Sequence, residues 1–119
     1  MPGRILFVDD DKNIIKLYAR IFSGDKYSLA TALNFTEAAA LIESNHYDLL
    51  VTDLFFPDGL GTELVKLFEK KRAGAKSLLV TGSPEAGRIL KSAGITEYFL
   101  KPFEVRRFLT AVTKALAAD

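Results

Sequence analysis

Four short apolar runs set the architecture of this chain; they lie at residues 5–8, 49–52, 78–80 and 98–100. Continuous apolar runs of this length are typical of strands that are buried on both faces of a sheet. A weaker strand is expected at residues 27–32, and segments with helical spacing lie between and after the strands. Strands and helices that alternate in this way predict a parallel sheet with right-handed crossovers and helices on both faces.

The ends of several elements carry turn and cap signals. Gly24 is expected to close the first helix, Thr36 to cap the second, and Ser83 to cap the fourth with Pro84 in its first turn. Residues 56–59 predict a turn in which Gly59 takes a positive φ. The strands are expected at residues 4–8, 27–32, 48–53, 77–81 and 96–100.

Length and composition indicate one globular domain. The chain has 119 residues, of which 49% are hydrophobic and 26% charged, and its net charge is +1, so no overall field favours nucleic acid or membrane as a partner. We expect a single domain over residues 1–119, no direct nucleic-acid binding, no membrane association and, most simply, a cytoplasmic location.

Some classes of site are excluded by residue counts. The chain has no cysteine, which excludes disulfides and sulfur-ligated zinc, and its one histidine, His46, cannot build a multi-histidine metal site. There is no phosphate-binding glycine motif of the P-loop or dinucleotide type, and Ser83 has no histidine base near it in sequence. His46 is expected to be a surface residue at the far end of the sheet.

Each apolar run ends in a polar residue of a type that phosphate chemistry uses. In parallel sheets the carboxyl ends of the strands meet at one edge, and ligands bind outside that edge. The sequence therefore predicts a polar site at the strand ends. Its candidate residues are Asp9, Asp10 and Asp11 after the first run, Asp53 after the second, Thr81 after the third and Lys101 after the last.

The three consecutive aspartates favour a cation site. One aspartate would be enough to cap the following helix, whereas adjacent like charges cost free energy unless a cation is present. Mg²⁺ is the natural partner, because it prefers oxygen ligands. Asp53 is either a nucleophile or a metal ligand, or it simply ends a strand. The Lys101–Pro102 bond, at a bend, is a reasonable place for a cis peptide.

Taken together, these residues resemble the receiver domain of two-component response regulators, over essentially the whole chain. The resemblance implies an α/β, flavodoxin-like (βα)5 fold, a doubly wound parallel sheet with strand order 2-1-3-4-5 in a three-layer sandwich. The matching segments are Val8-Asp9-Asp10, Asp53, Pro57 and Gly61, Val80-Thr81-Gly82 and Lys101-Pro102-Phe103.

The resemblance also implies a metal site and a phosphoacceptor. Asp53 would accept a phosphoryl group and would bind Mg²⁺ together with Asp10 and the backbone carbonyl of Phe55. Asp9 would assist through water, and Asp11 would then be a helix cap.

Three further residues would contact the phosphoryl group or respond to it. Thr81 would donate a hydrogen bond to it, Lys101 would pair with it, and Tyr98 would be the aromatic residue that moves inward when Thr81 moves. The surface formed by the fourth helix, fifth strand and fifth helix, residues 84–117, would then change to control a partner or output domain. Four basic residues in this range indicate either a contact surface for a partner or a helix face exposed to solvent. They are Arg88, Lys91, Arg106 and Arg107.

The implied phosphodonor is a phosphohistidine on a sensor histidine kinase or phosphotransfer protein. The domain itself would be no enzyme beyond self-catalysed phosphorylation and dephosphorylation, and the sequence leaves dimerisation through residues 84–117 open. Phe55 is bulky where the family often has polar residues, so we expect it to shield the phosphoryl group from water and slow self-dephosphorylation.

The sequence is also compatible with two other functions. A haloacid-dehalogenase-like phosphatase would use Asp9 as nucleophile and Asp11 as acid/base. The chain is short for that fold, and Asn13 stands where such a phosphatase usually has Thr or Val. The acidic pair expected after Lys101 is also missing. The second alternative is a binding module on the same fold that works without phosphorylation.

Overall fold

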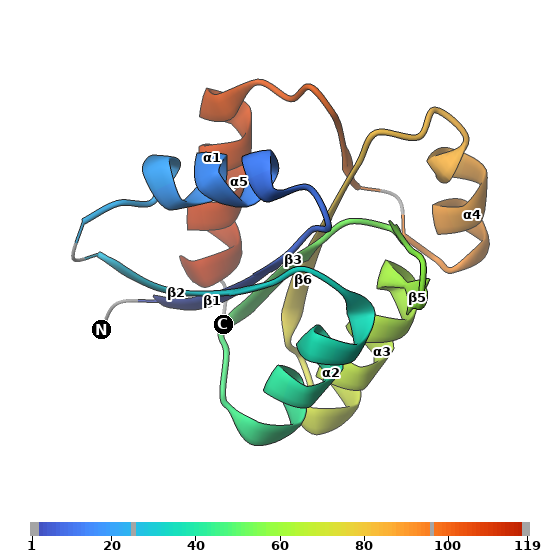
Figure 1. Cartoon of the computed structure of the whole chain (residues 1–119), viewed down its shortest axis with the longest axis horizontal. Helices are drawn as coiled ribbons and strands as arrows, with labels where there is room; N and C mark the ends of the chain where they lie inside the picture. Colours follow the sequence, from blue (N-terminus) through green and yellow to red (C-terminus); the bar gives the residue numbers. More distant parts are fainter. Residues whose placement is uncertain (1–2, 25, 96, 118–119) are drawn as a thin grey trace.

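The computed structural model of the protein describes residues 3–24, 26–95 and 97–117. Its centre is a five-stranded parallel sheet in the order β2-β1-β3-β6-β7 (Figure 1). This confirms the flavodoxin-like fold with strand order 2-1-3-4-5, because β6 and β7 are the fourth and fifth strands of that sheet. The strands are β1 (Gly3–Val8), β2 (Tyr27–Ala32), β3 (Leu49–Thr52), β6 (Lys76–Thr81) and β7 (Phe99–Leu100).

Helices cover both faces of the sheet, as the alternating pattern predicted (Figure 1). On one face α1 and α5 pack over the strands, and on the other face α2, α3 and α4 do so. The helices are α1 (Lys12–Ile21), α2 (Phe35–Ser44), α3 (Gly61–Lys71), α4 (Ala86–Ser92) and α5 (Val105–Ala117). Among the described residues, no helix is long and apolar enough to cross a membrane.

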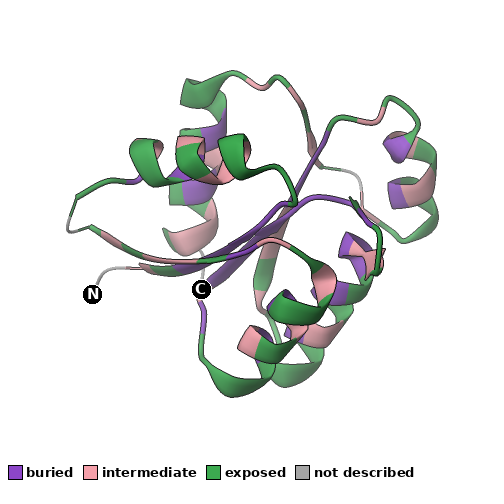
Figure 2. Ribbon diagram, in the orientation of Figure 1, coloured by how far each residue is buried: buried purple, intermediate pink, exposed green. Residues whose placement is uncertain are grey.

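The two central strands are buried on both sides (Figure 2). In β1, Leu6 and Val8 belong to the core beneath α2, α3 and α4, whereas Ile5 and Phe7 belong to the core beneath α1 and α5. The second core is strongly aromatic: the ring of Tyr18 on α1 stacks on Phe7 with centroids 4.4 Å apart. These strands are rigid supports for the residues that follow them.

The start of α2 differs from the prediction that Thr36 caps it. Asn34 is the N-cap, and its side chain accepts a hydrogen bond of 2.8 Å from the Glu37 N–H. Thr36 lies in the first turn instead, where its hydroxyl donates to Asp58 over 2.7 Å. Both residue types can cap a helix, and the extended backbone of Asn34 decides between them.

The prediction that Ser83 caps α4 is also wrong, because α4 begins at Ala86. Ser83 and Pro84 form a turn before the helix, in which the Ser83 carbonyl accepts a hydrogen bond from the Ala86 N–H. The last strand is shorter than predicted: β7 comprises Phe99 and Leu100, and position 96 of the predicted strand lies outside the described residues.

A short antiparallel hairpin follows β3, and it contains the predicted turn. It pairs β4 (Phe55–Phe56) with β5 (Gly59–Leu60). The expected positive φ at Gly59 is wrong, since among the described residues only Gly24, Gly74 and Gly94 have one. Gly59 is instead required by close packing: a Cβ there would lie 2.5 Å from the Phe35 ring.

Candidate functional site

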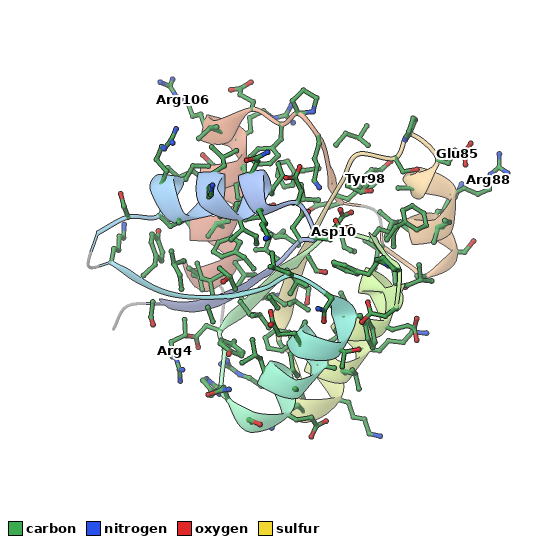
Figure 3. All side chains as sticks on the ribbon, in the orientation of Figure 1. Arg4, Asp10, Glu85, Arg88, Tyr98 and Arg106 are labelled. Carbon is green, nitrogen blue, oxygen red and sulfur yellow. The ribbon has the colours of Figure 1, made fainter. Side chains whose placement is uncertain are left out.

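The ends of four strands bring the candidate residues together at one edge of the sheet. Backbone hydrogen bonds continue the strand pairing into the site: the Asp53 N–H donates to the Val8 carbonyl, and the Lys101 N–H donates to the Thr81 carbonyl. Asp10, at the carboxyl end of β1, lies at this edge, whereas Arg4 lies at the opposite end of the sheet (Figure 3). The predicted convergence of polar side chains is therefore present.

Three carboxylates form the acidic centre of the site. Asp9, Asp10 and Asp53 each offer an oxygen, and these oxygens all lie within 4.8 Å of one another. Asp9 is completely buried, Asp53 is nearly so, and Asp10 is exposed. Asp11 stays out of the cluster because it caps α1, accepting a hydrogen bond of 2.8 Å from the Asn13 N–H, as expected.

Lys101 neutralises part of this acidic centre. Its ammonium nitrogen lies 2.7 Å from Asp9 Oδ2 and donates a hydrogen bond of 3.0 Å to Asp53 Oδ2. Burial opposes the charge on Lys101, but the two carboxylates outweigh burial and raise the pKa of Lys101 above its ordinary value. Lys101 therefore stays protonated and links β1, β3 and the segment after β7. The peptide bond that follows it, Lys101–Pro102, is cis as predicted.

The two oxygens of Asp9 have different surroundings. Oδ1 accepts a hydrogen bond of 2.9 Å from the Asp11 N–H. Oδ2 is buried and lies 2.7 Å from the Lys101 ammonium, which is its one polar partner among the described residues. Burial raises the pKa of the Asp9 carboxyl, while Lys101 and the Asp11 N–H oppose the rise in part. Oδ2 thus depends on a single cation, and as a carboxylate oxygen it can accept a second one.

The donor set of the cluster fits a hard divalent cation. Mg²⁺ prefers oxygen ligands and usually binds proteins through one or two carboxylates while keeping several waters. The cluster meets that requirement, since it offers oxygens from two buried carboxylates, Asp9 and Asp53, and from the exposed Asp10. Three carboxylates arranged in this way can hold Mg²⁺.

Thr81 and Tyr98 lie on the side of the site that faces α4. The Thr81 side chain is buried, and its hydroxyl oxygen accepts a hydrogen bond of 3.2 Å from the Ser83 N–H. The Tyr98 hydroxyl lies against α4, since a Cβ added at Gly87 would come within 2.6 Å of it. Figure 3 shows Tyr98 between the site and α4.

One buried residue near the site was not identified from the sequence. Tyr18 has its pKa raised by burial first and then by the negative charges of Asp9 and Asp53, so its phenol remains neutral. Its helical spacing predicted only that it is buried, and no local signal indicated that it would lie near two carboxylates. His46, in contrast, is an exposed residue beside Asp48 and Arg72, as expected.

Comparison with known proteins identifies the family. The sequence matches the response regulator receiver domain family over residues 5–113, so the chain belongs to that family. It is therefore a response regulator receiver domain of two-component systems. Such domains are generally phosphoacceptors rather than enzymes, and membership implies a histidine kinase as partner.

Individual relatives agree with this assignment. The chain is 33% identical to the transcriptional regulatory protein ResD of Bacillus subtilis (strain 168), covering 95% of this chain and 47% of that protein. The chain thus spans between about a quarter and a half of the length of the first curated regulators it matches.

Solved structures show the same fold. A receiver domain protein (CheY-like) from Methanospirillum hungatei JF-1 has a TM-score of 0.85 at 34% identity, covering 98% of this chain and 94% of that one. The response regulator TrrA from Thermotoga maritima, in complex with Mg²⁺–BeF, has a TM-score of 0.83 at 33% identity, covering 95% of this chain and 98% of that one.

We predict that Asp9→Asn makes the chain more stable near neutral pH when Mg²⁺ is absent. The Asp9 carboxyl ionises near its ordinary pKa of 3.8 in the unfolded chain, whereas its pKa in the fold is raised. The folded chain therefore binds this proton more tightly than the unfolded chain does. The resulting stabilisation of the fold is complete below pH 3.8 and is lost as the pH rises through the raised pKa of the folded state. Lys101 keeps Asp53 as a partner in the variant, so we expect a net gain of about 1 kcal/mol, the usual size for a stabilising change at a functional site.

Urea unfolding with a metal chelator, near neutral pH and again near the ordinary aspartate pKa, measures this difference. The gain should shrink at the lower pH, and added Mg²⁺ should stabilise the unaltered chain more than the variant. A variant that is less stable than the unaltered chain at neutral pH would show that the Asp9–Lys101 contact outweighs the cost of burying the charge.

Proposed function

We propose that this chain is a phosphorylation-dependent signalling switch in which Asp53 accepts a phosphoryl group. The observation that carries the proposal is the position of the Lys101 ammonium, in contact with both Asp9 and Asp53 at the carboxyl edge of the sheet. A cation held there can move from two carboxylates to a phosphoryl oxygen with little change in side-chain position. Phosphoryl transfer depends mainly on such positioning and charge neutralisation.

The donor in the proposal is a phosphohistidine of a histidine kinase or phosphotransfer protein. An Asp53 oxygen attacks the phosphorus atom, a phosphorus–oxygen bond forms, the phosphorus–nitrogen bond breaks, and the leaving imidazole takes a proton from solvent. Asp10, Asp53 and the carbonyl of Phe55 would hold Mg²⁺, with Asp9 acting through water. When bound, Mg²⁺ supplies positive charge that neutralises the phosphoryl oxygens.

Thr81 and Lys101 would bind the phosphoryl group on Asp53. The Thr81 hydroxyl now accepts from Ser83, which leaves its own proton available for a phosphoryl oxygen. Lys101 pairs with the same group. Movement of Thr81 toward Asp53 vacates space, and Tyr98 leaves its position against α4 to fill it. The equilibrium between two packings of α4, β7 and α5 then shifts.

The surface of α4, β7 and α5 is the proposed contact with the output domain or another partner. A groove of about 590 Å³ lies there, and its lining includes Leu100, Glu104 and Arg107. Leu100 is 47% exposed, although it is a large apolar residue at a strand end. Arg88 and Arg106 extend into solvent from α4 and α5 (Figure 3). The same surface would serve if two copies of the chain associate.

We further propose that residues 1–119 act as one receiver domain in the cytoplasm, with no chemistry beyond their own phosphorylation and dephosphorylation. The position of Asp11 supports this proposal over a phosphatase. In a phosphatase of the haloacid-dehalogenase type Asp11 would be the acid/base, but here its carboxylate caps α1.

Labelling with acetyl phosphate tests the proposed function. With Mg²⁺ present, intact-protein mass spectrometry should show addition of one phosphoryl group, and Asp53→Asn should abolish it. Asp9→Asn should slow the labelling without moving its site. Catalytic turnover of phosphate esters that requires Asp9 and not Asp53 would instead establish a phosphatase, and no labelling of the unaltered chain would favour a phosphorylation-independent binding module.

We predict that Phe55→Asn shortens the lifetime of the phosphorylated chain. Phe55 follows Asp53 by two residues and is 41% exposed, so its ring can restrict the approach of water to the phosphoryl group. Removing a shield that contributes about 1 kcal/mol to the barrier would raise the rate of dephosphorylation about fivefold. Loss of label after removal of acetyl phosphate measures this rate.

Leu109→Asn provides the matched control, because Leu109 is an exposed apolar residue on α5, away from the acidic cluster. The control should keep the original lifetime. If the lifetime of the Phe55→Asn form is also unchanged, Phe55 does not shield the phosphoryl group.

A further inference from the structure

The hairpin of β4 and β5 contains too few residue pairs to hold its own shape. Only Phe55 with Leu60 and Phe56 with Gly59 are paired. Isolated hairpins are marginal in water even when they are longer, so this one depends on contacts with the rest of the fold. The hairpin starts two residues after Asp53 and carries the backbone carbonyl of Phe55, the third metal ligand of the proposed function. Its orientation therefore bears directly on the site.

Packing fixes the base of the hairpin. The Gly61 N–H donates to the Leu54 carbonyl over 2.7 Å, and a Cβ at Gly61 would lie 2.0 Å from the Asp53 carbonyl oxygen. The Leu54 N–H donates to Asp53 Oδ1 over 2.6 Å, and the Phe56 ring is buried in the core. These contacts hold the start and the end of the segment, and they leave the tip to be held from outside.

Asp58 holds the tip of the hairpin on the start of α2. Its carboxylate accepts hydrogen bonds from the Phe35 N–H at 3.1 Å, the Thr36 N–H at 3.0 Å and the Thr36 hydroxyl at 2.7 Å. The neighbouring Gly59 allows the Phe35 ring to pack directly on the tip. The first N–H groups of a helix have no partner within the helix and favour negative charge. Asp58 satisfies two of them from 22 or 23 residues away.

Asn34 closes the same helix end independently. Its side chain accepts from the Glu37 N–H, while the Glu37 carboxylate accepts from the Leu33 N–H at 2.9 Å. The helix thus has a cap from its own segment and a second cap from the hairpin. Only the second cap, Asp58, connects α2 to the segment that carries Phe55.

We propose that Asp58 is a positioning residue for the metal site: by fixing the hairpin to α2, it sets the direction in which the Phe55 carbonyl points. The proposal rests on the proposed function, because it assumes that this carbonyl contributes to Mg²⁺ binding. Asp58 touches neither the metal nor the phosphoryl group in this scheme. Its effect passes through the backbone of residues 55–58.

Two alanine variants separate positioning from helix stability. Asp58→Ala removes the connection between the hairpin and α2, whereas Asn34→Ala removes a cap from the same helix end and leaves Asp58 in place. Both should lower the melting temperature by comparable amounts. Mg²⁺ titration followed by amide NMR shifts measures the affinity of each folded variant directly, without any activity assay.

Groups that directly support a metal ligand contribute roughly 10- to 100-fold to metal affinity. Asp58 acts less directly, through the backbone of the hairpin, so we expect Asp58→Ala to weaken Mg²⁺ binding about fivefold. Asn34→Ala should change the affinity less than about twofold. Asp58→Asn, which keeps an oxygen acceptor, should lie between. Equal weakening by both alanine variants, or no weakening by Asp58→Ala, would overturn the positioning role.

The unaltered chain separates this inference from the function on which it rests. If that chain binds Mg²⁺ and is labelled on Asp53 while Asp58→Ala matches it in affinity, only the role of Asp58 is refuted. If the unaltered chain neither binds Mg²⁺ nor accepts a phosphoryl group, the proposed function fails and this inference fails with it.

Discussion

The contact of Lys101 with two carboxylates is the interaction on which the site depends. Parallel pairing of β1 with β3 brings Asp9 and Asp53 to one edge, and like charges at that spacing repel one another. The Lys101 ammonium relieves the repulsion by lying 2.7 Å from one carboxylate and 3.0 Å from the other. The relief is incomplete, because Lys101 brings one positive charge to a cluster of three carboxylates. An additional cation such as Mg²⁺ would reduce the remaining repulsion.

The surrounding structure keeps these charges in place at a cost in stability. Asp9 follows a strand whose side chains are buried on both faces, so it cannot move away from Asp53 without disturbing the core. Burial of its carboxylate is unfavourable, as the raised pKa indicates. Functional sites commonly retain such unfavourable groups because the activity requires them. On this side the site borders the aromatic core, and the phenol of Tyr18 there remains neutral.

The sequence was informative where one local signal had one structural meaning. Short apolar runs can be buried strands, and parallel strands must share an edge, so the meeting of Asp9, Asp53, Thr81 and Lys101 followed from the pattern. Two of the errors occurred at positions that distant residues contact, whereas the misplaced cap at Ser83 arose from a local turn before α4. Thr36 and Asn34 are both acceptable caps, but Asp58, more than twenty residues away, binds the Thr36 hydroxyl. Gly59 is required by the Phe35 ring rather than by its own φ, and no local pattern contains that information.

We propose that Lys101 holds the carboxylates in the resting state and transfers to the phosphoryl group on activation. A structure of this chain with Mg²⁺ and beryllofluoride, which stands in for the phosphoryl group, tests it most directly. We expect beryllofluoride on Asp53, with the Lys101 ammonium and the Thr81 hydroxyl in hydrogen-bond contact with its fluorides. Tyr98 should no longer lie against Gly87. Beryllofluoride on another residue, or Lys101 still bound to Asp9 and Asp53 with no contact to the fluorides, would contradict it.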